Sequence, residues 1–270
     1  MNPALITVIE NQDTNLGEGS KSRIRPPNME DEALLCFKSW REYAGDFKDI
    51  PIYAICPSKR VPHKSTILKM VNLGVTYIGH YLPETDGFTC GYWNVPIACH
   101  FLEHELTEDF LIHTDLDMMV VKPLVEELFY CEKDVLAKIG TITKCRTIDP
   151  SLEINFETCF INSWRDNSFY HIWEKELKIA QLEFANEGIF KDTETFRYSE
   201  IEEHVIDIMY KDDKYNIQPI HNYQIGSWYP AEDIPDISKV YFHHDHLYEP
   251  KRAKALESYL RRWLNYAKSQ

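Results

Sequence analysis

Apolar and polar positions along the first 80 residues predict strands that alternate with helices. Short apolar runs rich in β-branched residues predict strands, and apolar residues at helical spacing predict helices. The expected elements are a strand over 4–10, a helix over 31–43, a strand over 51–57, a helix over 63–73 that ends at Gly74, and a strand over 75–78. This alternation is typical of a parallel sheet covered by helices.

The same pattern continues through the rest of the chain. We expect a helix over 92–106, strands over 110–112, 135–139 and 156–162, helices over 169–182 and 198–210, a short strand over 240–242, and a final helix over 251–270. The predicted fold class is therefore α/β, with a mixed, mostly parallel central sheet flanked by helices. Because no repeat or low-complexity run interrupts the pattern, we expect one domain over 1–270 with no linker.

Two carboxylates, Asp115 and Asp117, directly follow the apolar run Phe110-Leu111-Ile112. In an extended chain, side chains two positions apart point to the same side, so both can face one small volume. Like charges at that distance repel unless a proton or a cation lies between them. Carboxylate oxygens suit Mg²⁺ or Mn²⁺, and ligands bind beyond the carboxyl ends of strands in α/β sheets. The alternative is a solvated acidic turn.

Composition narrows the function classes. The chain has 270 residues, of which 44% are hydrophobic, and a net charge of −14. This charge argues against a nucleic-acid-binding protein, which needs a basic footprint. It also means that an anionic ligand needs a metal ion or local cations to be held.

The cysteines and the first residues of the chain indicate the cellular compartment. The seven cysteines are Cys36, Cys56, Cys90, Cys99, Cys131, Cys145 and Cys159. Their number is odd and they form no Cys-x-x-Cys pair, which favours reduced thiols and a cytoplasmic location. The first ten residues lack the basic and apolar regions of a signal peptide, and no apolar run approaches the ~20 residues of a membrane span.

The segment Asp-Leu-Asp-Met-Met-Val-Val-Lys-Pro-Leu, which ends at Leu124, resembles the metal-binding segment of GT-A type glycosyltransferases, above all families 8 and 32. The resemblance implies a Rossmann-like fold in which Asp115 and Asp117 hold Mn²⁺ or Mg²⁺ against the diphosphate of a UDP- or GDP-sugar. It further implies a hexosyltransferase that moves the sugar, with retention, to a glycan, glycoprotein or lipid-linked acceptor.

A histidine cluster near the C-terminus offers a third metal ligand. The run Lys-Val-Tyr-Phe-His-His-Asp-His over 239–246 resembles the short strand and ligand histidine of family 8. We rank His243 first, His244 second and His246 third, since imidazole together with carboxylates favours Mn²⁺ over Ca²⁺. A solvent-facing turn, or a separate metal site with Asp245, is the alternative.

Several residues are candidates for contact with the nucleotide-sugar donor. A polar segment over 11–28 carries Arg23 and Arg25, which can meet a diphosphate; its alternative role is a solvated loop. In similar enzymes the helix before the Asp-x-Asp strand supplies a polar group to the sugar, which points to Asn94. Thr7 and Leu116 complete the donor-binding candidates.

Acceptor and catalytic candidates come from two later segments. The run Phe-Glu-Thr-Cys-Phe-Ile-Asn over 156–162 resembles a family 8 strand that reads Phe-Asn-x-Gly, so Asn162 and Trp164 are candidates for the acceptor side; sheet packing is the alternative. Glu202 and Glu203 are the candidate bases, which only an inverting enzyme requires. Solvated charges on a helix face are the alternative for both.

The final helix over 251–270 is basic and amphipathic, so it can lie on anionic lipid or pack on the domain.

Two other interpretations of the whole chain compete with a transferase. A haloacid dehalogenase type phosphatase also carries Asp-x-Asp after a strand, but on its first strand. A non-catalytic sugar-nucleotide-binding or scaffold protein on a decayed transferase fold is the second alternative.

Overall fold

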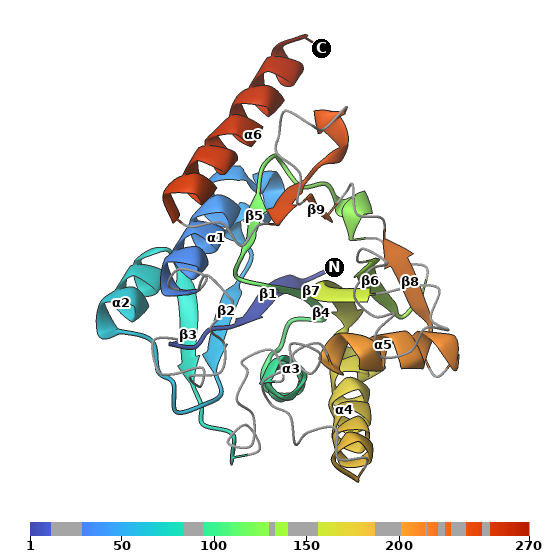
Figure 1. The fold of residues 1–270 in the computed structure, drawn as a ribbon. Coiled ribbons are helices and arrows are strands. Elements are labelled where there is room, and N and C mark those ends of the chain that lie inside the picture. Colours follow the sequence, from blue (N-terminus) through green and yellow to red (C-terminus); the bar gives the residue numbers. More distant parts are fainter. Residues whose placement is uncertain are drawn as a thin grey trace.

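The computed structural model describes residues 1–11, 29–83, 94–129, 133–139, 156–186, 201–213, 215–220, 225–227, 236–244 and 249–269. A seven-stranded sheet runs through the middle of the molecule in the order β3-β2-β1-β4-β7-β6-β8 (Figure 1). Its strands are β1 (Pro3–Val8), β2 (Ile52–Cys56), β3 (Val75–Gly79), β4 (Phe110–Thr114), β6 (Val135–Ile139), β7 (Phe156–Trp164) and β8 (Ile217–Ile220).

Strand direction changes only around β7. The pairs β1–β2, β1–β4, β2–β3 and β6–β8 are parallel, whereas β7 runs antiparallel to both β4 and β6. The α/β class and the mixed, mostly parallel sheet are thus confirmed. The last strand, β8, contains Pro219, which fits an edge position because proline cannot donate to a second neighbour.

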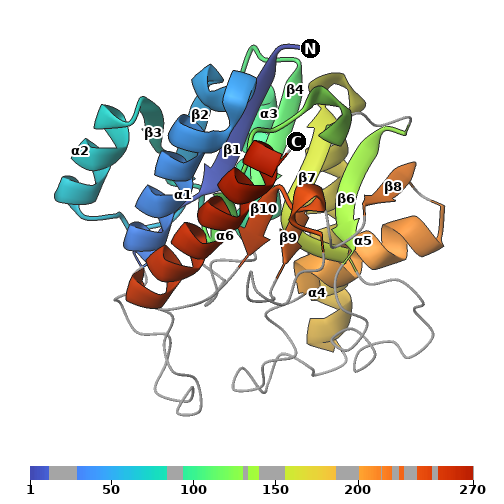
Figure 2. The same cartoon turned by 90° about the horizontal axis from the view of Figure 1, so that it is seen from above.

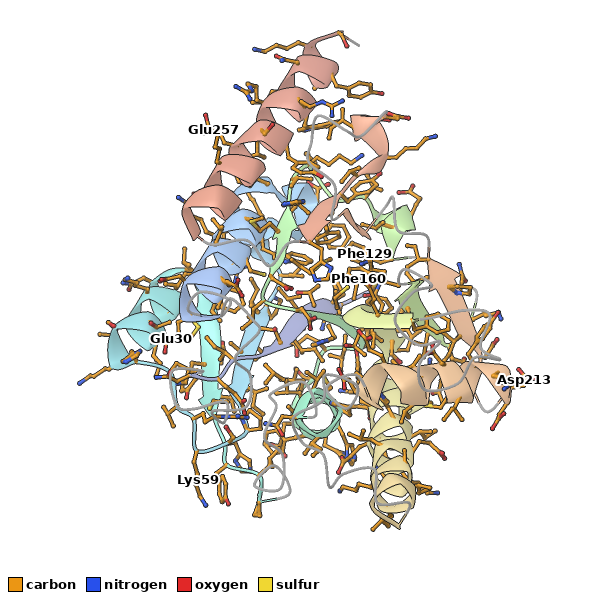
Figure 3. All side chains as sticks on the ribbon, viewed as in Figure 1. Glu30, Lys59, Phe129, Phe160, Asp213 and Glu257 are labelled. Atoms are coloured by element: carbon orange, nitrogen blue, oxygen red, sulfur yellow. The ribbon has the colours of Figure 1, made fainter. Side chains whose placement is uncertain are left out.

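Helices cover both faces of this sheet. They are α1 (Met29–Tyr43), α2 (Lys64–Asn72), α3 (Asn94–Glu105), α4 (Phe169–Asn186) and α5 (Ile201–Lys211). Buried residues of α1 and α2 join one apolar core, and those of α3, α4 and α5 join the core on the opposite face. In the first core, the rings of Phe129 and Phe160 lie 6.3 Å apart (Figure 3). Gly74 follows α2 with φ of +70°, as expected for a residue after a helix end.

A second, smaller sheet packs on the first core. It has the order β5-β10-β9, formed by β5 (Met118–Val120), β10 (Phe242–His244) and β9 (Ile225–Ser227). The pattern of the sequence did not predict β5, β8 or β9, which have three or four residues each. Short 3-10 helices occupy Gly45–Asp49, Glu126–Leu128, Arg165–Asn167 and Ile237–Lys239.

The final helix, α6 (Glu249–Ser269), crosses over the small sheet and α1 (Figure 2). Tyr259 is fully buried and forms a third apolar cluster with residues that include Met119 of β5 and Val240. The helix is therefore packed on the protein through part of its apolar stripe, while Leu264 is 55% exposed. Among the described residues, no helix combines the length and the apolar character needed to cross a bilayer.

Candidate metal centre

The two acidic residues lie on a tight turn between β4 and β5, not on an extended stretch. The backbone N–H of Met118 donates to the carbonyl of Asp115 at 3.2 Å, and the N–H of Asp115 donates to the carbonyl of Cys159 at 3.0 Å. Between the acids, Leu116 is 3% exposed and belongs to the apolar core. The expectation of an extended chain is wrong, because the hydrogen bond between Met118 and Asp115 closes a turn over these residues.

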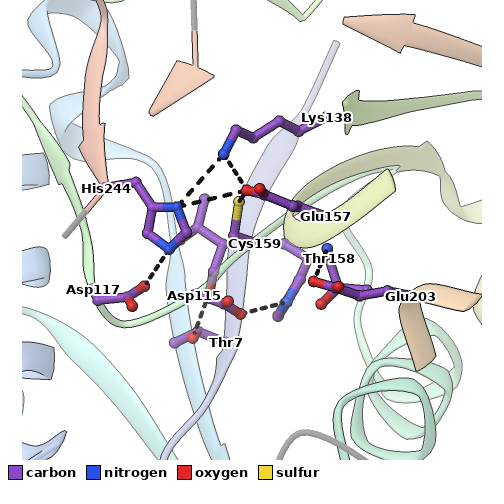
Figure 4. Close-up of polar contacts among 11 residues, drawn as sticks. Thr7, Asp115, Asp117, Lys138, Glu157, Thr158, Cys159, Glu203 and His244 are labelled. Atoms are coloured by element: carbon purple, nitrogen blue, oxygen red, sulfur yellow. Dashed lines mark hydrogen bonds and ion pairs between the residues drawn. The ribbon is translucent and has the colours of Figure 1, made fainter. Parts of the chain in front are cut away.

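His244 completes a three-residue group with this acid pair. β10 pairs antiparallel with β5 so that His244 lies opposite Met118, the residue after Asp117. His244 Nε2 lies 3.3 Å from Asp117 Oδ1 (Figure 4), and the ligand atoms of Asp115, Asp117 and His244 all lie within 4.8 Å of one another. Ligand atoms about 2.1 Å from one ion are roughly 3.0 Å apart at right angles and about 4.2 Å apart across it. The donor set therefore fits a divalent cation such as Mn²⁺ or Mg²⁺.

Burial keeps this group in a form suited to a metal. Burial lowers the pKa of His244, and the attraction of Asp117 offsets only part of this effect. A neutral imidazole is the form that binds metal ions. Asp117 is 5% exposed, while the side chain of Asp115 is 22% exposed and thus accessible to a ligand from solvent.

His243, the residue that the sequence ranked first, points elsewhere. Successive residues of a strand face opposite sides. The ring centroid of His243 lies 4.5 Å from that of Tyr259 on α6, and the ring is buried there. The geometry therefore brings His244, and not His243, to the acid pair, while the ligand role of either histidine stays a prediction. The third candidate, His246, lies outside the described residues, as does Asp245.

His113 is a buried histidine that lies next to Asp115. It is 1% exposed on β4, its Nε2 lies 3.5 Å from Asp115 Oδ1, and its Nδ1 lies 3.7 Å from Cys99 Sγ on α3. The sequence analysis did not single out this histidine. Its place in the apolar run, two residues before the first acid, is the signal that could have identified it.

A buried network of β6 and β7 residues lies behind His244. Lys138 Nζ donates to Glu157 Oε2 and lies 3.5 Å from His244 Nδ1, as Figure 4 shows. Burial works against the charge of Lys138, but attraction to Cys159 and Glu157 outweighs it, so its pKa is raised overall. Burial raises the pKa of the Cys159 thiol well above its usual value. The sequence indicated Glu157 and Cys159 only as departures from a motif and did not indicate Lys138.

Two donor candidates lie at the carboxyl ends of the parallel strands. The hydroxyl of Thr7 donates to the carbonyl of Thr114 at 2.8 Å and so ties β1 to the end of β4. Asn94 is fully buried at the start of α3, where its Nδ2 donates to Glu10 Oε1 at 2.7 Å. The second oxygen of Glu10 forms an ion pair of 2.5 Å with Arg60, which follows β2. Arg23 and Arg25 lie outside the described residues.

The two candidate bases begin α5 and differ in their surroundings. Glu203 Oε1 accepts from the backbone N–H of Thr158 on β7 at 3.4 Å, next to Glu157 and Cys159. Glu202 is 2% exposed, and its carbonyl accepts from Trp173 Nε1 at 3.0 Å. The Glu203 carboxylate thus contacts the strand behind His244.

Asn162 and Trp164 are not brought to the acid pair. Asn162 pairs with Ile112 in the middle of β4, and Trp164 pairs with Phe110 at its start. Trp164 is five residues away from Asp115 in this register, which corresponds to about 17 Å. Asn162 is fully buried in the sheet, and neither atom of its amide has a hydrogen-bond partner among the described residues. This register arises because β7 runs antiparallel to β4, and the acceptor-side role of these residues stays a prediction.

Comparison with known proteins supports the fold. No protein-family model matches the chain, and no curated protein matches it. The structure is similar to the crystal structure of the glycosyltransferase GlyE in Streptococcus pneumoniae TIGR4, with a TM-score of 0.55 and 13% sequence identity. The match covers 98% of this chain and 63% of that chain, so this chain spans less than two thirds of the length of GlyE. At this identity the similarity shows a shared fold.

Proposed function

We propose that this chain is a metal-dependent glycosyltransferase that uses a nucleoside-diphosphate sugar as its donor. One observation carries the proposal: Asp115 and Asp117, from the turn after β4, and His244, from β10, meet as a potential metal-ligand set. They do so on a fold shared with a solved glycosyltransferase. The relevant metal is Mn²⁺ or Mg²⁺, in accordance with the oxygen and imidazole donors.

The position of this set favours a nucleotide ligand. Thr7 and Glu10 lie at the carboxyl end of β1, Arg60 follows β2, and Asp115 follows β4. These strands are parallel neighbours, so their carboxyl ends share one edge of the sheet. Ligands of open α/β sheets bind at this edge. The donor would therefore lie across β1, β2 and β4, with its diphosphate at the acid turn.

The residues of the chain have distinct roles in this proposal. A divalent ion, when bound, supplies the positive charge that neutralises the departing nucleoside diphosphate. Asp115, Asp117 and His244 would hold that ion, and the ring of His113 lies 3.5 Å from Asp115 Oδ1. Asn94, whose amide is oriented by Glu10, is our candidate for contact with the sugar.

Retention of configuration is the expected outcome of transfer. A retaining enzyme needs no general base for the acceptor hydroxyl, whereas an inverting one does. Glu203 is the better placed of the two base candidates, because its carboxylate contacts β7 beside Glu157. The anomeric configuration of the product, measured by NMR, decides between the two stereochemical courses: an inverted product contradicts the expectation of retention and makes Glu203 the first residue to test.

Donor binding can be tested with a thermal-shift screen of UDP- and GDP-sugars, each with and without Mn²⁺. We expect a rise in melting temperature with one nucleotide class that requires Mn²⁺ and disappears in Asp117→Asn. Asp166→Asn is the matched control, since Asp166 is exposed on a 3-10 helix beyond the end of β7. Absence of any metal-dependent shift contradicts the proposal.

Turnover is a separate measurement. The acceptor is expected to be a glycan, a glycoprotein or a lipid-linked sugar, so hydrolysis of the donor in the presence of Mn²⁺ is the assay that needs no acceptor. Slow hydrolysis that Asp117→Asn abolishes supports an enzyme. Donor binding without hydrolysis, and without transfer to any of the three acceptor classes, favours a non-catalytic sugar-nucleotide-binding protein.

A further inference from the structure

A second potential metal-ligand group shares His244 with the first. The ligand atoms of Glu157, Cys159 and His244 also lie within 4.8 Å of one another, and all three residues are buried. Glu157 Oε2 lies 3.7 Å from Cys159 Sγ and 3.8 Å from His244 Nδ1. The two groups use opposite nitrogens of the ring, because Nε2 faces Asp117 while Nδ1 faces Glu157.

The two groups differ in the ions they favour. Carboxylate oxygens dominate the Asp115 and Asp117 side, which suits Mg²⁺ and Mn²⁺. A thiolate together with an imidazole and one carboxylate suits softer ions such as Zn²⁺ or Co²⁺. A neutral imidazole has one nitrogen lone pair, so an ion bound at Nδ1 on the Cys159 side would leave Nε2 protonated and unable to bind an ion at the acid pair.

Lys138 occupies the centre of this second group. It is fully buried on β6, and Glu157 is its direct cross-strand neighbour on β7, with Cys159 two residues further along. Its Nζ donates to Glu157 Oε2 and lies 3.5 Å from His244 Nδ1. The Glu157 carboxylate accepts from this ammonium and balances its charge.

We propose that the Lys138 ammonium acts as a built-in cation for the group of Glu157, Cys159 and His244, and thereby restricts a divalent ion to the Asp115–Asp117 side of His244. The ammonium fills the position that an ion would take and repels any second cation nearby. Lys138 is thus a metal-selecting residue, and this role rests on the proposed metal site.

The test uses Co²⁺ as a spectroscopic probe on the full chain. Co²⁺ bound to oxygen and nitrogen absorbs in the visible range, whereas a Co²⁺–thiolate bond adds a sulfur-to-metal charge-transfer band in the near ultraviolet. We expect wild-type protein to show visible absorption without the thiolate band. Lys138→Met should gain the band, because Cys159 then loses its proton to solvent and binds the ion. The double variant with Cys159→Ser should lack it.

The outcomes separate this inference from the proposed function. A thiolate band in wild-type protein, or its absence in folded Lys138→Met, overturns the role of Lys138. Visible absorption of wild-type protein that Asp117→Asn removes tests the Asp-side site independently. Should wild-type protein bind no Co²⁺ while Lys138→Met gains the band, the role of Lys138 stands and the proposed metal site falls.

Two further variants secure the interpretation. Lys122→Met makes the same substitution at another buried lysine, whose Nζ lies 3.6 Å from the ring centroid of Tyr241, and should gain no band. Lys138→Gln keeps a donor for Glu157, so it replaces Lys138→Met if that variant does not fold, as judged by circular dichroism. If neither folds, the wild-type spectrum decides: visible absorption without the thiolate band supports the inference, and the band contradicts it.

Discussion

The imidazole Nε2 of His244 lies 3.3 Å from Asp117 Oδ1, although 126 residues lie between the two in the sequence. The pairing of β10 with β5 brings them together at one end of the small sheet. This contact joins β10 to the turn after β4. It turns an acid pair, which alone forms a loose site, into a three-ligand set. The same register places the neighbouring residue, His243, against Tyr259 of α6.

The two adjacent histidines should therefore respond differently to substitution. We expect His244→Ala to weaken Mn²⁺ binding at least tenfold, because a ligand is lost. His243→Ala should change Mn²⁺ affinity less than threefold and lower stability through lost packing on Tyr259. Isothermal titration calorimetry with Mn²⁺, together with urea unfolding, measures both effects. Equal loss of Mn²⁺ affinity in the two variants would contradict the assignment.

Glu103 on α3 should make stability depend on pH. Burial raises its pKa to about 7, against the opposing effect of hydrogen bonds from the backbone N–H groups of His171 and Tyr170. Between about pH 4.5 and 7 the folded state keeps a proton on Glu103 that the unfolded chain releases, so stability falls as pH rises. The loss should be about 1–2 kcal/mol, because one pKa unit is worth 1.36 kcal/mol and the carboxylate keeps some access to water.

Substitution of Glu103 by glutamine removes this titration. Urea unfolding of the wild type and Glu103→Gln at pH 5, 6 and 7 should show a stability difference that shifts in favour of the variant as pH rises. Parallel pH profiles of the two proteins would show that Glu103 does not carry the effect.

Gly45 should be intolerant of a side chain. Its φ is +64°, and a Cβ there would lie 3.0 Å from Cβ of Pro123, in the segment that follows β5. Gly45→Ala combines backbone strain with this clash, so we expect a loss of about 2–3 kcal/mol. Gly74→Ala is the matched control, with a similar φ of +70° and a nearest contact of 3.6 Å, and should lose about 1 kcal/mol. Similar losses in urea unfolding would show that the contact with Pro123 is unimportant.

Tyr259 should anchor α6 to the rest of the protein. Its side chain is fully buried and packs on His243 and the third apolar cluster, so Tyr259→Ala should cost about 3–4 kcal/mol. Leu264→Ala, at a position that is 55% exposed, should cost less than about 0.5 kcal/mol. Urea unfolding compares them. A small effect at Tyr259 would mean that α6 is only loosely attached, which would favour a membrane-surface role for this helix.

The sequence by itself determined the alternation of strands and helices and the sheet class, and it indicated Asp115 and Asp117 as candidate metal ligands. Apolar periodicity and the place of an acid pair after a buried run are local properties, so they can be read from neighbouring residues. The tertiary structure alone decided which residues join that pair. His244, and not His243, lies beside the pair because the pairing of β10 with β5 decides which face of β10 points toward the acids. The pattern of apolar residues is compatible with either face.

Strand direction decided which residues of β7 lie near the acid turn. Trp164 and Asn162 lie away from the acid turn because β7 runs antiparallel to β4, and the same reversal brings Glu157 and Cys159 toward it, opposite Lys138. Strand direction and register arise from contacts between residues far apart in the sequence. No local pattern encodes such contacts, so the buried network behind His244 became visible only in the folded chain.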